Sequence, residues 1–454
     1  MTLYQHWYDF SIGVSIWDII GVLIIVGVLY LWAKQKASGK NKEAFYKYLH
    51  NAILIKVLAA IVFATITMMF YPGDTFEYFK YVNRLNTMLF SNSSHYFDIL
   101  FNGNQKEYWS YFNNETGYGA SYMWRDSNAM FVPRIYAPLM LLTYKSFILS
   151  TIMAALIGFS GLWKLFIVFC KLYPGMEKKF AIAILYFPSV LFWSSGILKD
   201  TLTIAALGWI VYSFYNFAIL KKFSLKYIIV IIISSIIIIN IKSYIFAALV
   251  PGLLVWLFFK QLSAIKSGLM EFVIAPILGI IVIGGFAILM SNLSGEMGAY
   301  GDVDKTLEQA KNIQEDLKRS EQYGENYYDI GEFEATPTGV LSKAPIAIIS
   351  GIFRPFIWEA RNPFVLLAAL ESLFMMGLLG FAFYKGGIIK SFRNIFKDPM
   401  LIFAFSFTII FGFGVGLATA NFGALVRYKI PMLPFFVSGL YILLGQQNKA
   451  KDGA

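Results

Sequence analysis

Apolar residues run along this chain in long stretches, and short polar segments separate these stretches from one another. A transmembrane α-helix needs about 20 predominantly apolar residues to cross the hydrocarbon core of a bilayer. The pattern therefore predicts eleven membrane-spanning helices, at residues 12–32, 52–71, 146–170, 180–194, 201–220, 227–240, 245–259, 270–291, 364–384, 399–419 and 431–445. Three of these stretches, 180–194, 227–240 and 245–259, are short, so we expect them to be tilted, kinked or buried among neighbouring helices.

Two longer segments, 72–145 and 292–363, interrupt the apolar pattern. The first is rich in aromatic and amide residues, and the apolar spacing that begins at Asp74 is typical of an amphipathic helix in the membrane interface. In the second segment, the spacing over 302–323 predicts a small water-exposed helix. Residues 340–358 are apolar but interrupted by proline and charged residues, so we expect them to lie in the interface.

These patterns divide the chain into four parts. Residues 1–50 hold an extra N-terminal transmembrane helix and a basic cytoplasmic loop, and residues 51–291 hold the membrane core with the long loop 72–145. Residues 292–363 form the second long loop, with soluble and interfacial helices, and residues 364–454 hold the C-terminal transmembrane helices. The predicted fold class is an all-α polytopic membrane protein with about eleven transmembrane helices.

The composition supports a membrane protein. Hydrophobic residues make up 58% of the 454 residues and charged residues only 14%, about half of the charged fraction that is usual in a soluble protein. A soluble chain of this length could not bury so much apolar surface, which excludes a cytosolic enzyme and a disordered chain. One cysteine excludes an internal disulfide, and three scattered histidines are too few for a histidine-based metal centre.

The distribution of charge indicates membrane topology. The 38 Lys and Arg residues outnumber the 27 Asp and Glu residues, which gives a net charge of +11. One set of short loops holds nineteen Lys and Arg residues, whereas the opposite short loops hold four, so the surplus marks a cytoplasmic face rather than a nucleic-acid site. We therefore expect the N-terminus and both long loops outside and the C-terminus in the cytoplasm. The absence of a large cytoplasmic loop favours the bacterial inner (plasma) membrane.

The first candidate site follows the second span, where the sequence from residue 71 is Tyr-Pro-Gly-Asp-Thr-Phe-Glu-Tyr. A carboxylate at the membrane boundary is costly unless it is paired or functional, so Asp74 and Glu77 are candidate catalytic residues. Asp74 would act as a general base or bind a cation, and Tyr78 would contact the substrate. The alternative is that Asp74 only caps the helix that follows.

The second candidate site is a short apolar hairpin between two spans that contains Lys199 and Asp200. A lysine beside a helix N-terminus at the membrane surface would attract a phosphate group, and Asp200 would contact the substrate. The alternative is a local ion pair in which Asp200 caps the following span.

A third candidate site contains two cations on the expected outer side, Arg427 and Lys429, directly before the last span. A cation pair at the lipid boundary suits an anionic lipid headgroup, so both residues are candidate ligands of a carrier phosphate. The alternative is that both side chains reach ordinary lipid phosphates without a specific ligand.

The fourth candidate site lies at the end of the second long loop. Arg354 and Arg361 could bind a phosphate or a sugar acid there, and Trp358 could stack on a sugar ring. The alternative is an aromatic anchor with a Glu–Arg pair. All four candidate sites fall at the outer membrane boundary, so we expect an amphiphilic substrate with a charged head at the surface and a tail in the lipid.

Three of these segments carry a resemblance. Asp74 follows a glycine directly behind a span, the sequence Arg427-Tyr-Lys-Ile-Pro-Met-Leu-Pro434 opens the last span, and Phe187-Pro188 precedes Leu198-Lys199-Asp200. The first resembles the start of the outer loop of GT-C-type membrane glycosyltransferases, and the second resembles their R-Y-x-x-P-x-x-P segment. The third is similar to a pattern in bacterial membrane proteins of polysaccharide assembly.

This resemblance implies a GT-C-like fold and an enzyme that moves a sugar from a polyprenyl-phosphate carrier to a glycan, lipid or protein acceptor outside the membrane. Asp74 would then be the base or the carboxylate that orients the acceptor, and Arg427, with Lys199, would hold the carrier phosphate. The chain departs from the family pattern because an extra helix precedes the acidic loop and because Asp74 and Glu77 are three residues apart rather than two. We therefore assign no metal ligand, and a requirement for a divalent metal stays open.

Three other functions stay open as alternatives. A polysaccharide polymerase would use the same kind of lipid-linked donor, with Arg354 and Arg361 at its outer face. A non-catalytic membrane subunit of an envelope complex would use the long loops as partner surfaces. A lipid or solute transporter would need charged residues deep in several spans, together with broken helices. Membrane lipids are expected partners in every case, and nucleic acid is not.

Overall fold

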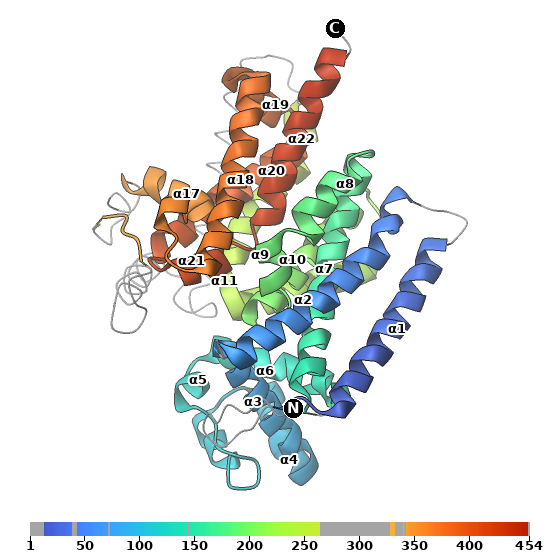
Figure 1. Cartoon of the computed structure of the whole chain (residues 1–454), viewed down its shortest axis with the longest axis vertical. Helices are drawn as coiled ribbons and strands as arrows, with labels where there is room; N and C mark the ends of the chain where they lie inside the picture. Colours follow the sequence, from blue (N-terminus) through green and yellow to red (C-terminus); the bar gives the residue numbers. More distant parts are fainter. Residues whose placement is uncertain are drawn as a thin grey trace. The chain divides into compact units, whose positions relative to one another are not determined.

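The structure is a computed structural model that describes residues 13–38, 43–70, 73–143, 145–263, 327–331, 339 and 342–452. The regular elements in these ranges are helices, and an isolated β-bridge joins Tyr327 to Asn421 (Figure 1). Seven of the helices are long and apolar enough to cross a membrane, and a bent pair near the C-terminus gives an eighth. The chain is therefore an all-α, multi-pass membrane protein, as its apolar pattern predicts. The expected span at 270–291 and helix at 302–323 lie outside the described residues.

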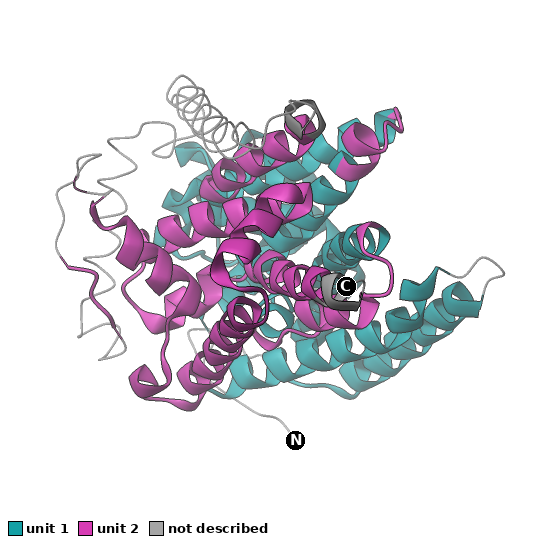
Figure 2. Cartoon of the chain, turned by 90° about the horizontal axis from the view of Figure 1, so that it is seen from above, with its two compact units in different colours: residues 1–171, 190–214, 225–242 teal, residues 172–189, 215–224, 243–454 magenta. Residues whose placement is uncertain are grey.

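The chain forms two compact units, which Figure 2 colours separately. Unit 1 comprises residues 1–171, 190–214 and 225–242, and unit 2 comprises residues 172–189, 215–224 and 243–454. Both units are thus assembled from segments that are distant in sequence. The four-part division expected from spans and loops follows a different criterion and stays a prediction.

The long helices of unit 1 carry most of its apolar surface. They are α1 (Ile16–Ser38), α2 (Leu49–Met69) with the preceding 3-10 turn η1 (Ala44–Tyr48), α7 (Phe147–Leu172), α10 (Lys199–Phe214) and the first part of α11 (Leu225–Ser263). Val57 and Ala60 of α2 form a small buried cluster with Ile152 and Ala155 of α7, and apolar residues of α1 pack against this cluster. Apolar packing therefore joins α1, α2 and α7 over this region, and the hydroxyl of Ser146, directly before α7, donates to Asp18 of α1.

Glycines allow α7 and α10 to touch along their backbones. A Cβ added at Gly161 would lie 2.2 Å from the carbonyl oxygen of Ala205, and one added at Gly208 would lie 2.0 Å from the carbonyl oxygen of Gly161. Small residues at helix crossings permit such a close approach. Close van der Waals packing is what holds helices together in lipid, where the hydrophobic effect does not drive their association. This contact fixes α10, and α10 carries Lys199 and Asp200 in its first turn.

The segment between α2 and α7 folds into a helical group rather than an irregular loop. It contains α3 (Gly73–Ser91), α4 (Ser93–Asn102), η2 (Lys106–Tyr111), α5 (Ser121–Arg125), α6 (Ser127–Met140) and η3 (Leu141–Thr143). Figure 1 shows α3, α4, α5 and α6 close together at one end of unit 1. Buried aromatic residues of this group, including Tyr81, Phe112, Trp124 and Tyr136, form its core. The helix expected at the start of this segment is α3.

The three expected short spans are interrupted or kinked. The stretch near 180–194 is divided into α8 (Glu177–Phe180), the π-helical turn η4 (Ala181–Leu185) and α9 (Pro188–Trp193). Proline begins α9 because it has no N–H to continue the preceding helix. The stretches 227–240 and 245–259 lie on either side of a kink at Lys242, where φ is −149° and ψ is 75°, so α11 consists of two helical segments.

Unit 2 is built mainly from the C-terminal third of the chain. Its elements include η5 (Tyr215–Ile219), α17 (Ala344–Phe353), η7 (Ile357–Glu359), α18 (Pro363–Gly386), α19 (Ile388–Lys397), α20 (Pro399–Ala418), α21 (Phe422–Tyr428) and α22 (Leu433–Asp452). Polar side chains accept hydrogen bonds from the first backbone N–H groups of three of these helices: Asn362 at α18, Asp398 at α20 and Asn421 at α21. These caps define where each helix begins. A bend of 65° separates α21 from α22.

Small residues also bring α17 and α20 into backbone contact. A Cβ added at Gly416 would lie 1.9 Å from the carbonyl oxygen of Ala347, and one added at Gly351 would lie 2.0 Å from the carbonyl oxygen of Gly412. In each helix the two small residues are four positions apart, so both lie on one face, as in the small-xxx-small pattern of membrane helix pairs. The apolar stretch at the end of the second long loop is thus packed on a span.

Candidate functional site

Helix α3 carries the first candidate site on one of its faces. Its first turn holds Asp74, which is exposed, and Glu77 follows one turn later. Carboxylates are favoured at this position because they oppose the positive end of the helix macrodipole. Spacings of three and four residues place Tyr81 and Arg84 on the same face. Glu77 is paired with Lys80, whose Nζ lies 2.9 Å from its Oε1.

The loop before α5 lies against this face of α3. The hydroxyl of Tyr81 donates to the carbonyl oxygen of Ala120 over 2.6 Å. A Cβ added at Gly117 would lie 3.4 Å from Nε of Arg84, and Gly117 has a φ of +80°, which a side chain would disfavour. The loop is therefore held close to both side chains.

Tyr122 extends the site from α5. Its side chain is 66% exposed, and that of Tyr118 in the same segment is 60% exposed. The pKa of Tyr122 is raised first by partial burial and then by the negative charges of Glu77 and Asp74. The charges of both carboxylates therefore act on its hydroxyl group. The hydroxyl stays protonated at neutral pH, so it can donate a hydrogen bond. Exposed aromatic rings beside carboxylates can contact a sugar through its ring face and its hydroxyl groups.

Arg84 adds a cation with an unused donor. Its guanidinium lies over the ring of Tyr81, 5.4 Å from the ring centroid. Burial lowers the pKa of Arg84, while the neighbouring Tyr81 and the carboxylate of Glu77 act in the opposite direction. Its Nη1 atom is buried and has no hydrogen-bond partner among the residues that the structure describes. A ligand with oxygen acceptors, such as a phosphate or a hydroxylated sugar, would satisfy this donor.

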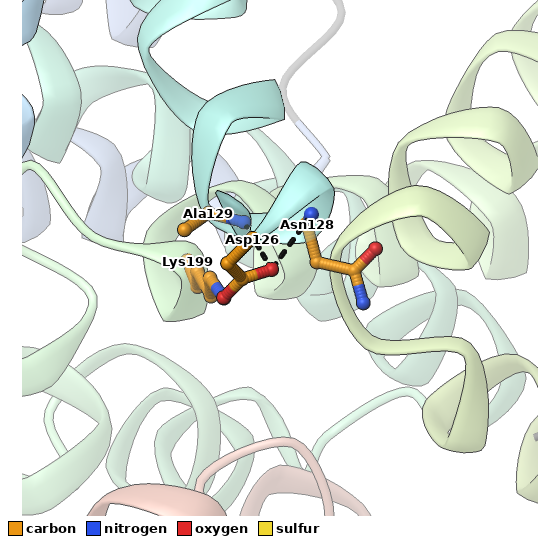
Figure 3. A network of polar contacts seen from close by, with 4 residues as sticks. All are labelled: Asp126, Asn128, Ala129 and Lys199. Atoms are coloured by element: carbon orange, nitrogen blue, oxygen red, sulfur yellow. Dashed lines mark hydrogen bonds and ion pairs between the residues drawn. The ribbon is translucent and has the colours of Figure 1, made fainter. Parts of the chain in front are cut away.

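Lys199 is held by an ion pair with a residue far along the chain. Its Nζ lies 3.3 Å from Oδ2 of Asp126. Figure 3 shows that Asp126 also caps α6, because its Oδ1 accepts from the backbone N–H groups of Asn128 and Ala129 over 2.9 and 3.0 Å. The Lys199 side chain is 19% exposed, so it still reaches the surface of unit 1. Part of its charge is already balanced by Asp126.

Two predicted substrate contacts are inside unit 1. Asp200 is 1% exposed and forms an ion pair with Lys242, which is 7% exposed and stands at the kink of α11. Tyr78 is 3% exposed and belongs to the core of the α3–α6 group. The ion pair satisfies two charges that would otherwise be costly among apolar helices. Asp200 and Tyr78 therefore support the site through the packing beneath its surface, and neither is exposed to contact a substrate.

In unit 2, Arg354 is engaged on several sides. Its Nε lies 3.3 Å from Oε1 of Glu359, and its guanidinium lies 4.8 Å from the ring centroid of Tyr328. Its Nη1 atom is buried without a hydrogen-bond partner among the described residues. Trp358, by contrast, is 80% exposed, and Arg361 is exposed as well. The Glu–Arg pair considered from the sequence is thus present, and Trp358 lies at the surface of this unit.

The two cations before the last span have different environments. Lys429 is fully buried, and its Nζ donates over 3.0 Å to the carbonyl oxygen of Arg354 and over 3.0 Å to Oγ of Ser372. It therefore stabilises the bend between α21 and α22 from within unit 2. Arg427 is half-buried in the last turn of α21. Of the two, only Arg427 reaches the surface, so Arg427 is the better candidate for a contact with phosphate.

Buried charges also occur within the candidate spans, at the two ends of α9. In unit 1, Nζ of Lys56 donates to the carbonyl oxygen of Leu191 over 3.2 Å and to Oγ of Ser194 over 2.5 Å. In unit 2, the backbone N–H of Ser189 donates to Oε1 of Glu371 over 2.6 Å. A carboxylate is attracted to the partial positive charge at the start of a helix, and an ammonium group to the partial negative charge at its end. These contacts hold a helix of only six residues in place.

The predicted site residues are divided between the two compact units. Asp74, Glu77, Tyr78, Lys199 and Asp200 belong to unit 1, and Arg354, Trp358, Arg361, Arg427 and Lys429 belong to unit 2. The fold brings Asp74 and Glu77 onto one face of α3, and it joins Lys429 to the backbone of Arg354. Among the described residues, no three His, Cys, Asp or Glu side chains come together in a way that could hold a metal ion.

Sequence reasoning missed Arg84, Asp126 and the role of Tyr122. The sequence does contain a signal for Arg84: positions 74, 77, 81 and 84 are three or four residues apart, which places them on one face of a helix. The Asp-Ser-Asn sequence from residue 126 is also recognisable as a helix start. Its pairing with Lys199 is not, because 73 residues separate the two partners.

The described helices define the class of this protein, an all-α multi-pass membrane protein with a packed helical group between its second and third long helices. Comparison of the chain with protein-family models, with curated proteins and with solved structures finds no match.

Proposed function

We propose that this protein is a GT-C-like membrane glycosyltransferase, which moves a sugar or glycan from a polyprenyl-phosphate carrier to an acceptor at the outer face of a bacterial inner membrane. The observation that carries the proposal is the α3 face: an exposed carboxylate, Asp74, a few residues beyond the described end of a candidate span, with Tyr122 close enough to feel its charge. Arg84, with its unpartnered donor, lies further along the same face of α3. A substrate with a lipid tail and a polar head would bind at such a boundary.

In the proposed reaction Asp74 accepts the proton of an acceptor hydroxyl group. The acceptor oxygen then forms a bond with the anomeric carbon of the sugar while the bond from that carbon to the carrier phosphate oxygen breaks. The carrier leaves as a phosphate, and a cation, for which Lys199 of unit 1 and Arg427 of unit 2 are the candidates, balances its charge. Glu77, Tyr122 and Arg84 orient the sugar and the acceptor. The rings of Tyr118 and Trp358 are exposed and suited to stacking on a sugar.

An Asp74→Asn variant tests the role of the carboxylate. We expect this variant to bind the donor and not to transfer it, because asparagine keeps the size and an oxygen acceptor but cannot take a proton at neutral pH. Sugar-linked polyprenyl phosphate should then accumulate in membranes of cells that carry the variant in place of the wild type, measured by mass spectrometry of extracted lipids. Glu115→Gln, which changes another exposed carboxylate of the same segment, is the matched control and should leave these lipids unchanged.

The glycan on the accumulated carrier separates the two transferase variants of the proposal. A single sugar indicates a monosaccharide transferase, whereas an oligosaccharide indicates a polysaccharide polymerase. Unchanged lipids, with Asp74→Asn present in the membrane at the wild-type amount, would contradict the catalytic role and would favour a non-catalytic subunit of an envelope complex.

A lipid transporter is the second candidate function, and it is favoured by the buried charge of Lys56 within a candidate span of unit 1. Short, interrupted helices are a feature of membrane transporters, and Lys56 contacts the end of such a helix, α9. Proteoliposomes that contain the protein and fluorescent NBD-labelled phosphatidylglycerol test this alternative. If wild-type protein carries the inner-leaflet lipid outward, dithionite bleaches nearly all of the NBD fluorescence, and Lys56→Met should abolish this effect. If about half of the fluorescence stays protected with wild-type protein, the transport function is contradicted.

A further inference from the structure

Helix α19 occupies a defined position relative to two candidate spans. It runs from Ile388 to Lys397, directly after α18 and directly before α20, which begins at Pro399. Gly387 joins α18 to α19 with a φ of +74°, and the space around it is open, so its conformation rather than packing requires a glycine. Because a span adjoins each of its ends, α19 must lie at a boundary of the membrane.

The two faces of α19 have opposite character. Ile388, Ile389 and Phe392 are 59%, 86% and 48% exposed, and they lie together on one side of the helix. The other side carries three exposed cations, Lys390, Arg393 and Lys397. At 3.6 residues per turn, the centre of the apolar face and the centre of the cationic face are roughly 130° apart. Such a helix suits the interface of a bilayer.

The contacts of α19 within unit 2 leave most of both faces accessible: Phe392 stacks on Phe383 of α18, with ring centroids 6.1 Å apart, while Ile388 and Ile389 stay exposed. Its buried residue Ser391 accepts a hydrogen bond from Nε2 of Gln447 over 3.1 Å, so the helix is attached to α22 by an edge. The carboxylate nearest in sequence, Asp398, accepts from the hydroxyl of Tyr173 over 2.6 Å and from Nε2 of Gln446 over 2.7 Å. Asp398 also caps α20. It is therefore engaged away from the three cations.

We propose that α19 binds the surface of an anionic phospholipid leaflet. Its apolar face lies among the upper parts of the acyl chains, and Lys390, Arg393 and Lys397, with Lys385 at the end of α18, contact the lipid phosphates. The charge pattern and the position between two spans both favour a lipid surface over a protein partner. The inference is independent of the proposed glycosyl transfer and would hold equally for a transporter or a structural subunit.

The first test measures phospholipid binding to the full-length protein. The purified protein is titrated with dioleoylphosphatidylglycerol in detergent, and bound lipid is counted by native mass spectrometry. A variant with Lys390→Gln, Arg393→Gln and Lys397→Gln should bind this lipid about tenfold more weakly, since each cation near an anionic surface contributes to binding.

The matched control replaces three exposed lysines of another short loop, Lys221→Gln, Lys222→Gln and Lys226→Gln, and makes the same change in net charge. Binding in this control should stay close to wild type. Equal loss in both variants would show that net charge alone attracts the lipid and would overturn a specific role of α19. No loss in the α19 variant would contradict the proposal as well.

A second measurement does not depend on lipid affinity. Cys170, the single cysteine of the chain, is replaced by alanine, and an NBD label is attached through either Ile388→Cys or Lys390→Cys. In phosphatidylglycerol nanodiscs, spin-labelled lipids should quench the label at position 388 strongly and the label at position 390 weakly. These positions are roughly 160° apart around the helix. Equal quenching at both positions would overturn the interfacial placement of α19.

Discussion

Charged residues of this protein occur in two kinds of environment, with different energetic consequences. The pair of Lys242 and Asp200 is almost completely buried, whereas the pair of Lys199 and Asp126 lies at the surface of unit 1. Removing one partner of a buried pair leaves an uncompensated charge, while an exposed pair is screened by water. The two pairs adjoin one another in sequence at α10, so they allow a direct comparison.

We expect Lys242→Ala to destabilise the protein by about 3–5 kcal/mol, because the carboxylate of Asp200 would be left buried without its partner. Thermal unfolding in detergent measures this loss, and Lys199→Ala is the matched control, with an expected change of about 0–1 kcal/mol. The double variant Lys242→Met and Asp200→Leu should regain most of the lost stability. Similar losses in the two single variants would contradict this assignment.

At this scale the sequence predicts which residues carry charge at the boundary but not which residues they contact. Lys199 and Asp200 are adjacent, and a local pair is a reasonable expectation, yet their observed partners are 73 and 42 positions away. The positive charge of Lys429 is suited to a phosphate ligand, but its side chain is instead buried and donates to the backbone carbonyl of Arg354. Long-range packing decides these outcomes, and single-residue chemistry does not encode it.

At the scale of elements, glycines and alanines determine which spans approach most closely. Gly412 and Gly416 of α20 meet Ala347 and Gly351 of α17 at backbone distance. Gly414 lies between them on the same helix and has open space around it. The sequence contains both kinds of glycine, and only the structure separates those that pack from those that do not.

We expect Gly416→Ile to destabilise the protein by about 3 kcal/mol or more, since the new side chain would force α17 away from α20. Gly414→Ile introduces the same side chain on the opposite part of α20 and should change stability by no more than about 0.5 kcal/mol. Unfolding temperatures of both variants in the same detergent provide the comparison. A tolerated isoleucine at position 416 would contradict the close packing of these helices.

Other elements show what apolar patterns can and cannot predict. The long spans are predictable because about 20 apolar residues allow few other structures. The polar break between the stretches 227–240 and 245–259 coincides with the kink at Lys242, but the pattern does not predict that this lysine is buried in an ion pair. The spacing after Asp74 predicts a helix at the start of the group at 73–143, but the tertiary packing of this group depends on aromatic contacts between distant residues.

At the scale of the whole molecule, the proposed reaction requires the carboxylate of α3 and the cation of α21 to face the same side of the membrane. The distribution of Lys and Arg predicts this arrangement, with α19 on the opposite, cytoplasmic side.

Cysteine labelling in intact cells tests this topology. In a Cys170→Ala background, we expect Asp74→Cys and Arg427→Cys to react with a membrane-impermeant maleimide added from outside. Lys390→Cys should react only after the cells are permeabilised, because α19 faces the cytoplasm in the predicted orientation. Labelling of positions 74 and 427 from opposite sides would exclude a common substrate head and, with it, the proposed reaction.

The most direct test of the central claim, that the protein acts on a polyprenyl-phosphate-linked substrate, is native mass spectrometry of the protein titrated with undecaprenyl phosphate. We expect wild-type protein to bind this lipid in preference to dioleoylphosphatidylglycerol, and Arg427→Ala to lose the preference, because the carrier phosphate would lose its cation. Lys222→Ala, a change at another exposed cation, should leave the preference unchanged. Equal binding of both lipids by wild type, unaffected by Arg427→Ala, would contradict a carrier-dependent glycosyltransferase.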